Sequence, residues 1–267
     1  MEGKLDLRKL EKLVQGVLHR FGLVMMRWVS LQRLHLELRE SADTERNWKI
    51  FSAFPYDVKT FLHLRGVHKS QLGQDLLAVG VSQAKRDGFF VEFGATDGIG
   101  LSNTHLLEKE LGWTGILAEP GKNWHNSLHA NRRCQIVTNA LWSRSGEKIN
   151  FLEASVPELS TLSSFVQSDC HVREGSVYEV ESITLMDLLE QNGAPGFIDF
   201  LSVDTEGSEL EILSVFDFEK YRFGLLCIEH NYRPQREDVA SLLERNGYVR
   251  ILSDVSLWDS WFVQKGS

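Results

Sequence analysis

The feature that most constrains the fold of this chain is the alternation of strand-like and helix-like segments after Ser70. Short apolar runs such as Phe89-Phe90-Val91 alternate with longer segments whose apolar residues recur at helical spacing. This alternation is typical of a parallel sheet that is covered by helices on both faces. Strands are predicted at 89–93, 115–119, 135–141, 148–153, 177–184, 199–204, 224–229, 248–252 and 260–263, and helices at 102–111, 124–131, 185–191, 209–216 and 238–246.

The last two predicted strands, 248–252 and 260–263, lie too close in sequence for a crossover helix between them. We therefore expect them to pair antiparallel at the end of the sheet. The fold class predicted from the pattern is α/β.

The N-terminal segment has a different composition. Residues 1–40 hold eight Lys and Arg and five acidic residues, a charge of +3, whereas the whole chain carries −8. Apolar residues recur there at spacings of three and four, which predicts a long helix with one apolar seam. The seam of residues 5–40 could pack on its own domain, associate with a second copy or another partner, or lie on a membrane surface. We expect an N-terminal helical extension and connector at 1–69 and the main domain at 70–267.

Composition argues against several kinds of protein. The acidic excess disfavours sequence-independent binding to nucleic acid, which requires clustered Lys and Arg. There is no uncharged apolar stretch of membrane-spanning length, so neither a transmembrane span nor a signal peptide is expected. The three cysteines, Cys134, Cys170 and Cys227, form no C-x-x-C pair, which fits a reduced cytoplasmic location.

The first candidate site follows the strand at 89–93 and reads Glu92-Phe93-Gly94-Ala95-Thr96-Asp97-Gly98. Ligands of open α/β sheets bind at the carboxyl ends of the strands, where glycines let the backbone approach them. The segment lacks the G-x-G-x-x-G pattern of dinucleotide sites. An acid beside the turn suits a ligand with an ammonium group and would repel a pyrophosphate. A tight turn without a ligand is the alternative interpretation.

The next two strand ends carry Glu119 and Asn139-Ala140. A carboxylate at the position of Glu119 could accept hydrogen bonds from both hydroxyls of a ribose. The small residue Ala140 could lie against an adenine ring.

Two further strand ends carry groups that could take part in a reaction. Asp204 and Glu206 could bind a cation, hold an ammonium group or accept a proton. Ser208 is expected to cap the following helix together with Glu211. His230, after the strand at 224–229, is a candidate base, and a purely structural histidine is the equally supported alternative.

Together these segments resemble the FkbM-type methyltransferases. The resemblance rests on Gly94-Ala95-Thr96-Asp97-Gly98 with Ser102-Asn103-Thr104, on Ala118-Glu119-Pro120, on Asn139-Ala140, and on Val203-Asp204-Thr205-Glu206-Gly207-Ser208-Glu209; the upstream Ser70-Gln71-Leu72-Gly73-Gln74-Asp75 fits a subgroup. It covers about residues 70–264. One difference is Thr96, which stands where many class I methyltransferases have glycine.

The resemblance implies a class I methyltransferase fold, a seven-stranded Rossmann-like sheet with its last strand antiparallel, and S-adenosylmethionine as the methyl donor. It implies that residues of the first turn bind the donor, that Asn103 contacts its methionine part, Glu119 its ribose and Asn139-Ala140 its adenine. The turn residues concerned are Glu92, Gly94, Ala95, Asp97 and Gly98.

Methylation of a hydroxyl on a sugar, glycan or natural product is the activity expected. We expect His230 or Asp204 to accept the proton, and Glu206 to orient the acceptor or to hold a divalent cation with Asp204. The irregular stretch 154–177 could form a polar acceptor wall or a plain surface loop. The alternatives are an NAD-dependent dehydrogenase or epimerase, which the acid at Glu92 opposes, and a non-catalytic scaffold that works through the N-terminal helix.

Overall fold

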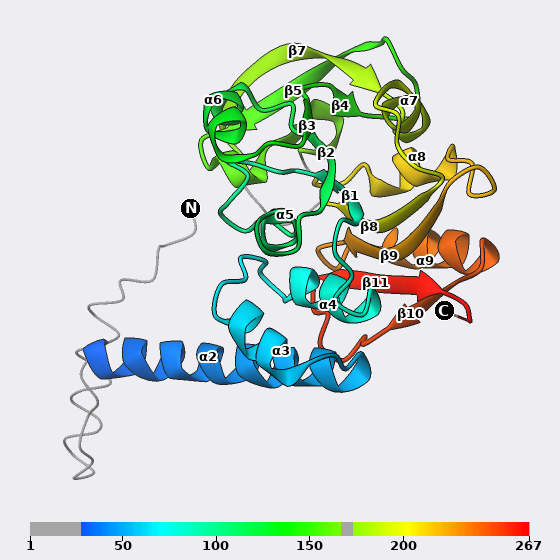
Figure 1. Ribbon diagram of the computed structural model, residues 1–267. Helices are drawn as coiled ribbons and strands as arrows, with labels where there is room; N and C mark the ends of the chain where they lie inside the picture. The colour runs from blue at the N-terminus through cyan, green and yellow to red at the C-terminus, as the bar shows by residue number, and fades with distance from the viewer. Residues whose placement is uncertain (1–27, 167–172, 267) are drawn as a thin grey trace. The chain divides into compact units, whose positions relative to one another are not determined.

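The computed structural model of the protein describes residues 28–166 and 173–266. The chain divides into two compact units, Met1–Glu45 and Arg46–Ser267, so residues 46–69 belong to the same unit as the sheet. Helix α2 covers Trp28–Ala53 (Figure 1). Most of the predicted apolar seam lies outside the described residues, and the docking role of residues 5–40 stays a prediction. Among the described helices, none is long and apolar enough to cross a membrane.

Seven strands form the main sheet, in the order β10-β11-β9-β8-β1-β2-β3. Strand β11 runs antiparallel to both of its neighbours, and the other pairs are parallel. This arrangement confirms the class I methyltransferase fold and the antiparallel pairing of the last two strands. The bounds are β1 Phe89–Phe93, β2 Thr114–Ala118, β3 Gln135–Val137, β8 Phe197–Val203, β9 Arg222–Glu229, β10 Tyr248–Ile251 and β11 Asp259–Gln264.

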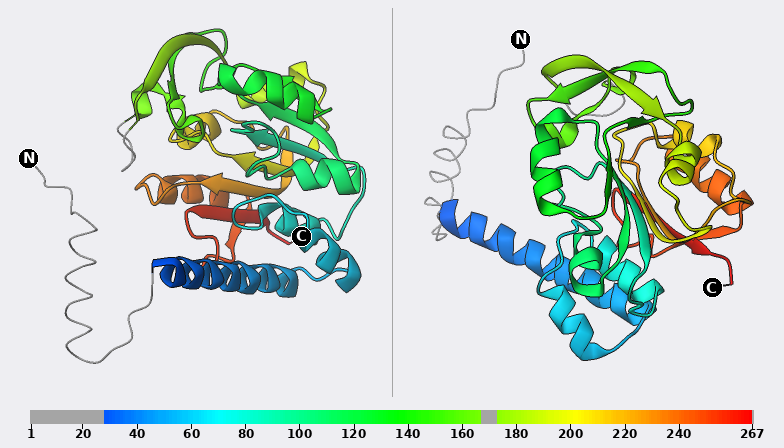
Figure 2. Two further views of the ribbon diagram at one scale, coloured as in Figure 1. Left: turned by 90° about the vertical axis from the view of Figure 1, so that its left-hand side faces the viewer. Right: turned by 45° about the horizontal axis from the view of Figure 1, so that its top comes forward.

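Helices cover both faces of this sheet, which is why its strands are continuous apolar runs (Figure 2). Consecutive side chains alternate between faces, so Phe90 and Val91 lie in different core clusters. One face packs on α7 (Leu185–Gln191), α8 (Glu209–Ser214) and α9 (Arg236–Arg245). The other packs on α4 (Gln74–Val81), α5 (His105–Leu111) and α6 (Lys122–Asn131). At about 25 cal/mol per Å² of apolar surface, this two-sided burial is the main stabilising contribution.

A second sheet, in the order β4-β7-β5-β6, is inserted between β3 and β8 (Figure 1). Its strands are β4 Ala140–Leu141, β5 Lys148–Ala154, β6 Thr161–Leu162 and β7 Gly175–Ile183, with short 3₁₀ turns at Pro157–Leu159 and Ser163–Phe165. The prediction of a single strand at 135–141 is wrong. The chain leaves β2 after Val137 and pairs with β7 from Ala140, so two strands of different sheets replace it.

The region predicted as a connector, 41–68, is largely helical. It contains the end of α2 and the helix α3 (Val58–Arg65), which Asp57 caps by accepting a hydrogen bond from the Thr60 amide. Helix α4 follows, and the sequence pattern does not predict it. The buried Asp75 carboxylate organises its start, because it accepts hydrogen bonds from the Lys69, Ser70 and Leu76 amides. Ser70 also forms a β-bridge with Leu101, so this segment is joined to the loop after β1.

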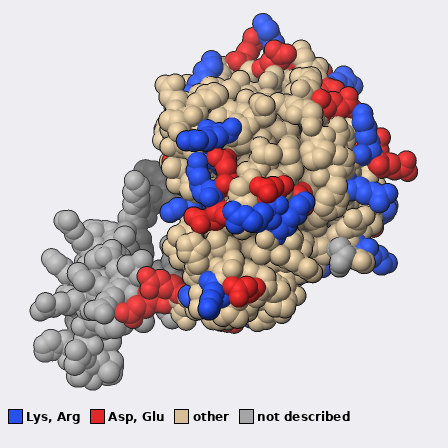
Figure 3. All heavy atoms as spheres, in the orientation of Figure 1, with Lys and Arg blue, Asp and Glu red and all other residues tan. Residues whose placement is uncertain are grey.

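Charges on the face drawn in Figure 3 are mixed, with basic side chains interspersed among acidic ones. Proteins that bind nucleic acid through its phosphates gather Lys and Arg in one patch or stripe. The expectation that nucleic acid is not a partner stays a prediction.

Candidate active site

A cavity of about 400 Å³ lies at the carboxyl ends of β1, β2, β8 and β9. The residues that follow these strands line it, as the topology of an open parallel sheet predicts. They include Gly94, Glu119, Asp204 and Glu229. The second sheet and its turns supply another side of the cavity, through Ala140, Leu141, Phe151, Glu158, Leu159, Ser160 and Leu162.

The turn after β1 depends on residues in left-handed backbone conformations. Gly94 has φ +73°, and a β-carbon on it would stand 2.5 Å from the Asp204 carbonyl oxygen. Thr96 has φ +47°, in the region that glycine occupies most readily. Its amide donates a hydrogen bond to Glu119 Oε2 at 2.9 Å. This bond stabilises threonine in a position where many related enzymes have glycine.

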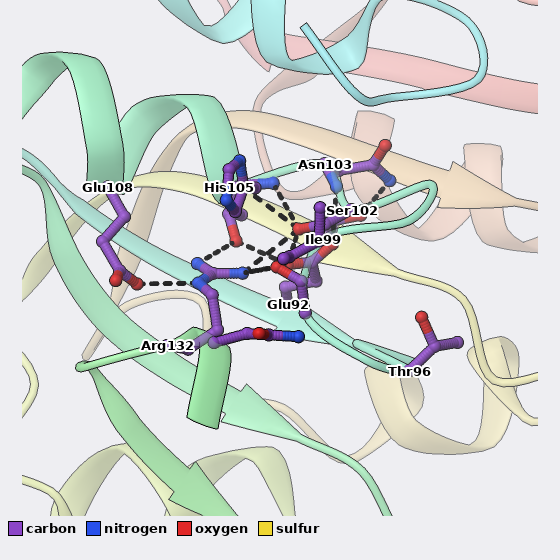
Figure 4. A network of polar contacts seen from close by, with 12 residues as sticks. Glu92, Thr96, Ile99, Ser102, Asn103, His105, Glu108 and Arg132 are labelled. Atoms are coloured by element: carbon purple, nitrogen blue, oxygen red, sulfur yellow. Dashed lines mark hydrogen bonds and ion pairs between the residues drawn. The ribbon is translucent and has the colours of Figure 1, made fainter. Parts of the chain in front are cut away.

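The Glu92 carboxylate is buried beneath this turn and is bound by the loop that follows it (Figure 4). Oε1 accepts a hydrogen bond from the Asn103 amide at 2.6 Å. Oε2 accepts from Ser102 Oγ at 3.0 Å and from Thr104 Oγ1 at 2.5 Å. Burial raises the pKa of Glu92, and the nearby Arg132 charge is the largest effect that opposes the rise. In this structure Glu92 therefore holds the loop 102–104 in place.

Asn103 is placed by that loop on the lining of the cavity. Its Nδ2 donates to Ser202 Oγ at 2.8 Å, which fixes the orientation of the amide. Its Oδ1 is buried and has no hydrogen-bond partner among the described residues. A buried acceptor without a partner costs about 1–3 kcal/mol, so this oxygen is suited to a donor group on a ligand.

Glu119 lies at the end of β2, where the Thr96 and Gly121 amides donate to its two oxygens at 2.9 and 2.8 Å. Burial raises its pKa to about 7. Ala140 also lines the cavity, and Asn139, Ala95, Asp97 and Gly98 do not. Asp97 instead accepts hydrogen bonds from the Ile99 and Gly100 amides and so shapes the loop.

Asp204 and Glu229 both line the cavity, and oxygens of their carboxyl groups lie within 4.8 Å of each other. Two carboxylates this close repel each other, which favours a proton on one of them. Burial raises the pKa of Asp204 to about 7 and that of Glu229 well above its usual range. Asp204 Oδ1 and Glu229 Oε2 have no partner among the described residues.

Glu206 also lines the cavity, but two buried arginines hold its carboxylate. Arg173 donates to Glu206 Oε2 at 2.8 Å and Arg233 to the same oxygen at 3.1 Å. Carboxylate oxygens of Asp204, Glu206 and Glu229 lie within 4.8 Å of one another. The two guanidinium groups offset the charge of Glu206 and would repel a cation placed beside it.

The predicted cap of α8 is wrong. Ser208 makes no capping hydrogen bond, and its hydroxyl donates to Thr205 Oγ1. The Glu209 carboxylate accepts from the Thr205 and Gly207 amides and from Thr205 Oγ1, all of which precede the helix. These bonds fix the turn that contains Glu206.

His230 is not brought into the main cavity. Its ring lines a separate, much smaller cavity on α9 with Arg233 and Arg236. Nδ1 accepts a hydrogen bond from the Tyr232 amide at 3.0 Å, and burial lowers the pKa of the ring. The structure thus brings Asp204 and Glu206 together with Glu229, and leaves His230 outside this group.

Several residues that line the cavity are not among those predicted from the sequence. The sequence pattern favours His230 over its neighbour Glu229. Gln74 and Asp259, far apart in sequence, meet through a hydrogen bond of 2.8 Å at the cavity wall. The Ser70–Asp75 motif is the available signal for Gln71 and Gln74, both of which line the cavity. Of the stretch 154–177, residues 158–160 and 162 line it as well.

The comparison with protein families decides between the functional classes. The family model of the methyltransferase FkbM domain matches residues 92–250. The chain belongs to the FkbM methyltransferase family. It is therefore a methyltransferase, and S-adenosylmethionine is the methyl donor that this family implies. A search of curated proteins found no match.

Solved structures also resemble this FkbM methyltransferase. Precorrin-6Y C5,15-methyltransferase from Geobacter metallireducens is 10% identical, with 72% of this chain and 87% of that chain covered and a TM-score of 0.41. A proposed RNA methyltransferase from Pyrococcus horikoshii is 9% identical, with 76% and 95% covered and a TM-score of 0.37.

Proposed function

We propose that this FkbM methyltransferase transfers the methyl group of S-adenosylmethionine to a hydroxyl on a sugar, glycan or natural product, with Asp204 and Glu229 as the proton acceptor. The observation that carries the proposal is the close approach of these two carboxyl groups on the cavity wall, where their oxygens lie within 4.8 Å of each other. Asp204 follows β8 directly and lies against Gly94 of the first turn, so the pair is next to the expected donor site.

The cavity residues fit the donor. The Asn103 Oδ1 without a partner among the described residues suits the ammonium group of the methionine part, and Gly94 leaves room for the donor to approach the backbone. Each Glu119 oxygen accepts one backbone hydrogen bond and keeps a second lone pair for a ribose hydroxyl. Ala140 offers a small apolar surface to the adenine. When bound, S-adenosylmethionine supplies an electrophilic methyl group.

The carboxyl pair meets the chemical need of a hydroxyl acceptor. A sugar hydroxyl is a weak acid, so it attacks a methyl group well only when a base removes its proton. A carboxylate whose pKa is raised towards neutrality is a stronger base than an exposed one. The close approach of the two groups favours one bound proton on the pair, and the buried Asp204 Oδ1 and Glu229 Oε2 have no hydrogen-bond partner among the described residues. One carboxylate of the pair then takes up the acceptor proton.

The two other predicted roles receive less support. A base at His230 would have to act from outside the main cavity. A divalent cation on Asp204 and Glu206 would lie beside the guanidinium groups of Arg173 and Arg233. We therefore favour proton transfer by the carboxyl pair over cation binding.

Two experiments test the proposed function. Calorimetric titration should show binding of S-adenosylmethionine and none of NAD. An acceptor screen with labelled donor should compare neutral glycans, small phenols and proteins. Label on a glycan or phenol hydroxyl is expected, and label confined to protein side-chain nitrogen would overturn the hydroxyl assignment.

A further inference from the structure

Arg132 is a buried cation outside the cavity for which the proposed reaction gives no role. It follows α6 as its C-cap residue, and its side chain is 0% exposed. Its guanidinium lies over the Phe90 ring, 5.4 Å from the centroid. In the sequence it belongs to the polar run Asn131-Arg132-Arg133, which has the appearance of an exposed helix end.

The guanidinium of Arg132 binds both ends of the loop 98–104 (Figure 4). One nitrogen, Nη1, donates to the Gly98 carbonyl oxygen and to Ser102 Oγ, both at 3.2 Å. The other, Nη2, donates to Thr104 Oγ1 at 2.9 Å. A planar fork with several fixed donors can bridge separate acceptors in a way that a lysine ammonium cannot.

Two acidic residues complete the network. Arg132 Nε donates to Glu108 Oε2 at 2.8 Å, which anchors the side chain to α5. Arg132 Nη1 also lies 3.7 Å from Glu92 Oε2. Glu92 in turn accepts the Asn103 amide hydrogen bond. The charge of Arg132 therefore supports the carboxylate that sets the position of Asn103.

The glycine of the first motif is adapted to this arrangement. Gly98 has φ +79°, and a β-carbon there would stand 2.6 Å from Arg132 Cγ. The motif and Arg132 thus fit together by shape as well as by hydrogen bonds.

We infer that Arg132 is a positioning residue for the methyl donor, which holds the loop 98–104 so that Asn103 presents Oδ1 to the methionine part. This inference rests on the donor placement proposed above. Arg132 does not line the cavity, so it acts through Glu92 and through Gly98, Ser102 and Thr104 of the loop.

The test compares two ligands that differ in the amino-acid part. S-adenosylhomocysteine has it and 5′-methylthioadenosine lacks it. Arg132→Lys should raise the Kd of S-adenosylhomocysteine about tenfold, because the fork is lost, and leave the Kd of 5′-methylthioadenosine within about twofold, since Glu119 is outside the network. Arg133→Met, on the adjacent exposed side chain, is the matched control and should change neither value.

A second pair of variants addresses folding. The Thr104 side chain makes no helix-capping hydrogen bond, so Thr104→Val removes only its bonds with Glu92 and Arg132. It should weaken S-adenosylhomocysteine binding in the same selective way, and Thr104→Ser should restore it. Circular dichroism and thermal unfolding check that each variant is folded.

Selective loss of S-adenosylhomocysteine affinity in both series would support the inference. Equal weakening of both ligands, or no change in either, would overturn it. Failure of the unaltered protein to bind S-adenosylmethionine at all would instead contradict the proposed function.

Discussion

Gly94 and Asp204 approach so closely that the only side chain compatible with the backbone at residue 94 is a hydrogen atom. A β-carbon there would stand 2.5 Å from the Asp204 carbonyl oxygen. The turn after β1 and the end of β8 are therefore locked together, because the two strands are adjacent parallel neighbours. This contact fixes the distance between the expected donor site and the carboxyl pair.

Gly94→Ala should lower both stability and donor affinity. Alanine at a positive φ costs about 1 kcal/mol, and the steric conflict with Asp204 adds about 1–3 kcal/mol. Gly146→Ala is the matched control, since Gly146 has φ +77° and nothing within 4 Å of its added β-carbon. Chemical denaturation and calorimetric titration of S-adenosylmethionine measure the two effects. Equal destabilisation by both variants would show that the contact with Asp204 is unimportant.

Asp204→Asn and Glu229→Gln should each lower kcat by about 10²–10⁴, the range for loss of a general base. Neither substitution removes a donor contact, so the Kd of S-adenosylmethionine should stay within about threefold. His230→Gln is the comparison, and we expect it to retain most of the turnover because its ring lies outside the cavity. A larger loss with His230→Gln than with Asp204→Asn would reassign the base.

Turnover should rise with pH through about 7 and then level off. Burial raises the pKa of Asp204 to about 7, and the base must be unprotonated to accept the acceptor proton. Below this pH the pair takes up a second proton and activity falls. A profile of turnover against pH at saturating donor measures this rise. The residual activity of Asp204→Asn should not show it. If that variant keeps the same rise with pH, another group is responsible for the titration.

Removal of divalent cations by a chelator should leave turnover within about twofold of its original value. If catalysis needed a bound cation, its loss would raise the activation barrier by several kcal/mol. The basis is the pair of arginines on Glu206. Exhaustive dialysis against EDTA followed by assay with labelled donor makes the measurement. Abolished activity that returns with Mg²⁺ or Mn²⁺ would restore the cation role of Asp204 and Glu206.

Asp259→Asn should make the protein more stable at pH 8 and change little at pH 4. Burial raises the pKa of Asp259 from 3.8 to about 6, so the folded state favours its protonated form. The contribution of Asp259 to the free energy of unfolding is full below the pKa of the unfolded state and is lost as the pH rises through about 6. This contribution is roughly 3 kcal/mol.

Asparagine can keep the existing bonds at residue 259, because a single oxygen, Oδ2, accepts from both Gln74 and Trp261. Asp254→Asn, at an exposed carboxylate in the loop before β11, is the control. Thermal unfolding at the two pH values makes the comparison. If Asp259→Asn stabilises the protein equally at both pH values, the titration of Asp259 is excluded as the cause of the added stability.

The main sheet and the acids at its strand ends can be predicted from local sequence pattern. Apolar runs bounded by glycines are local signals, and the carboxyl ends of parallel strands must share one edge. For this reason the sequence pattern alone predicts Glu119, Asp204 and Glu206 as candidate site residues. It also predicts the strand β1 and the helix α7 with the bounds that the structure has.

Which of these groups act together depends on contacts between segments that are distant in the sequence. The break between Val137 and Ala140 depends on the distant partner β7. The approach of Asp204 to Glu229 and the fork of Arg132 over the loop 98–104 join segments that no local pattern relates. The direction in which His230 points is equally undetermined by the sequence. Local periodicity specifies a strand and its end, whereas the pairing of buried charges depends on the three-dimensional neighbours that must compensate their desolvation.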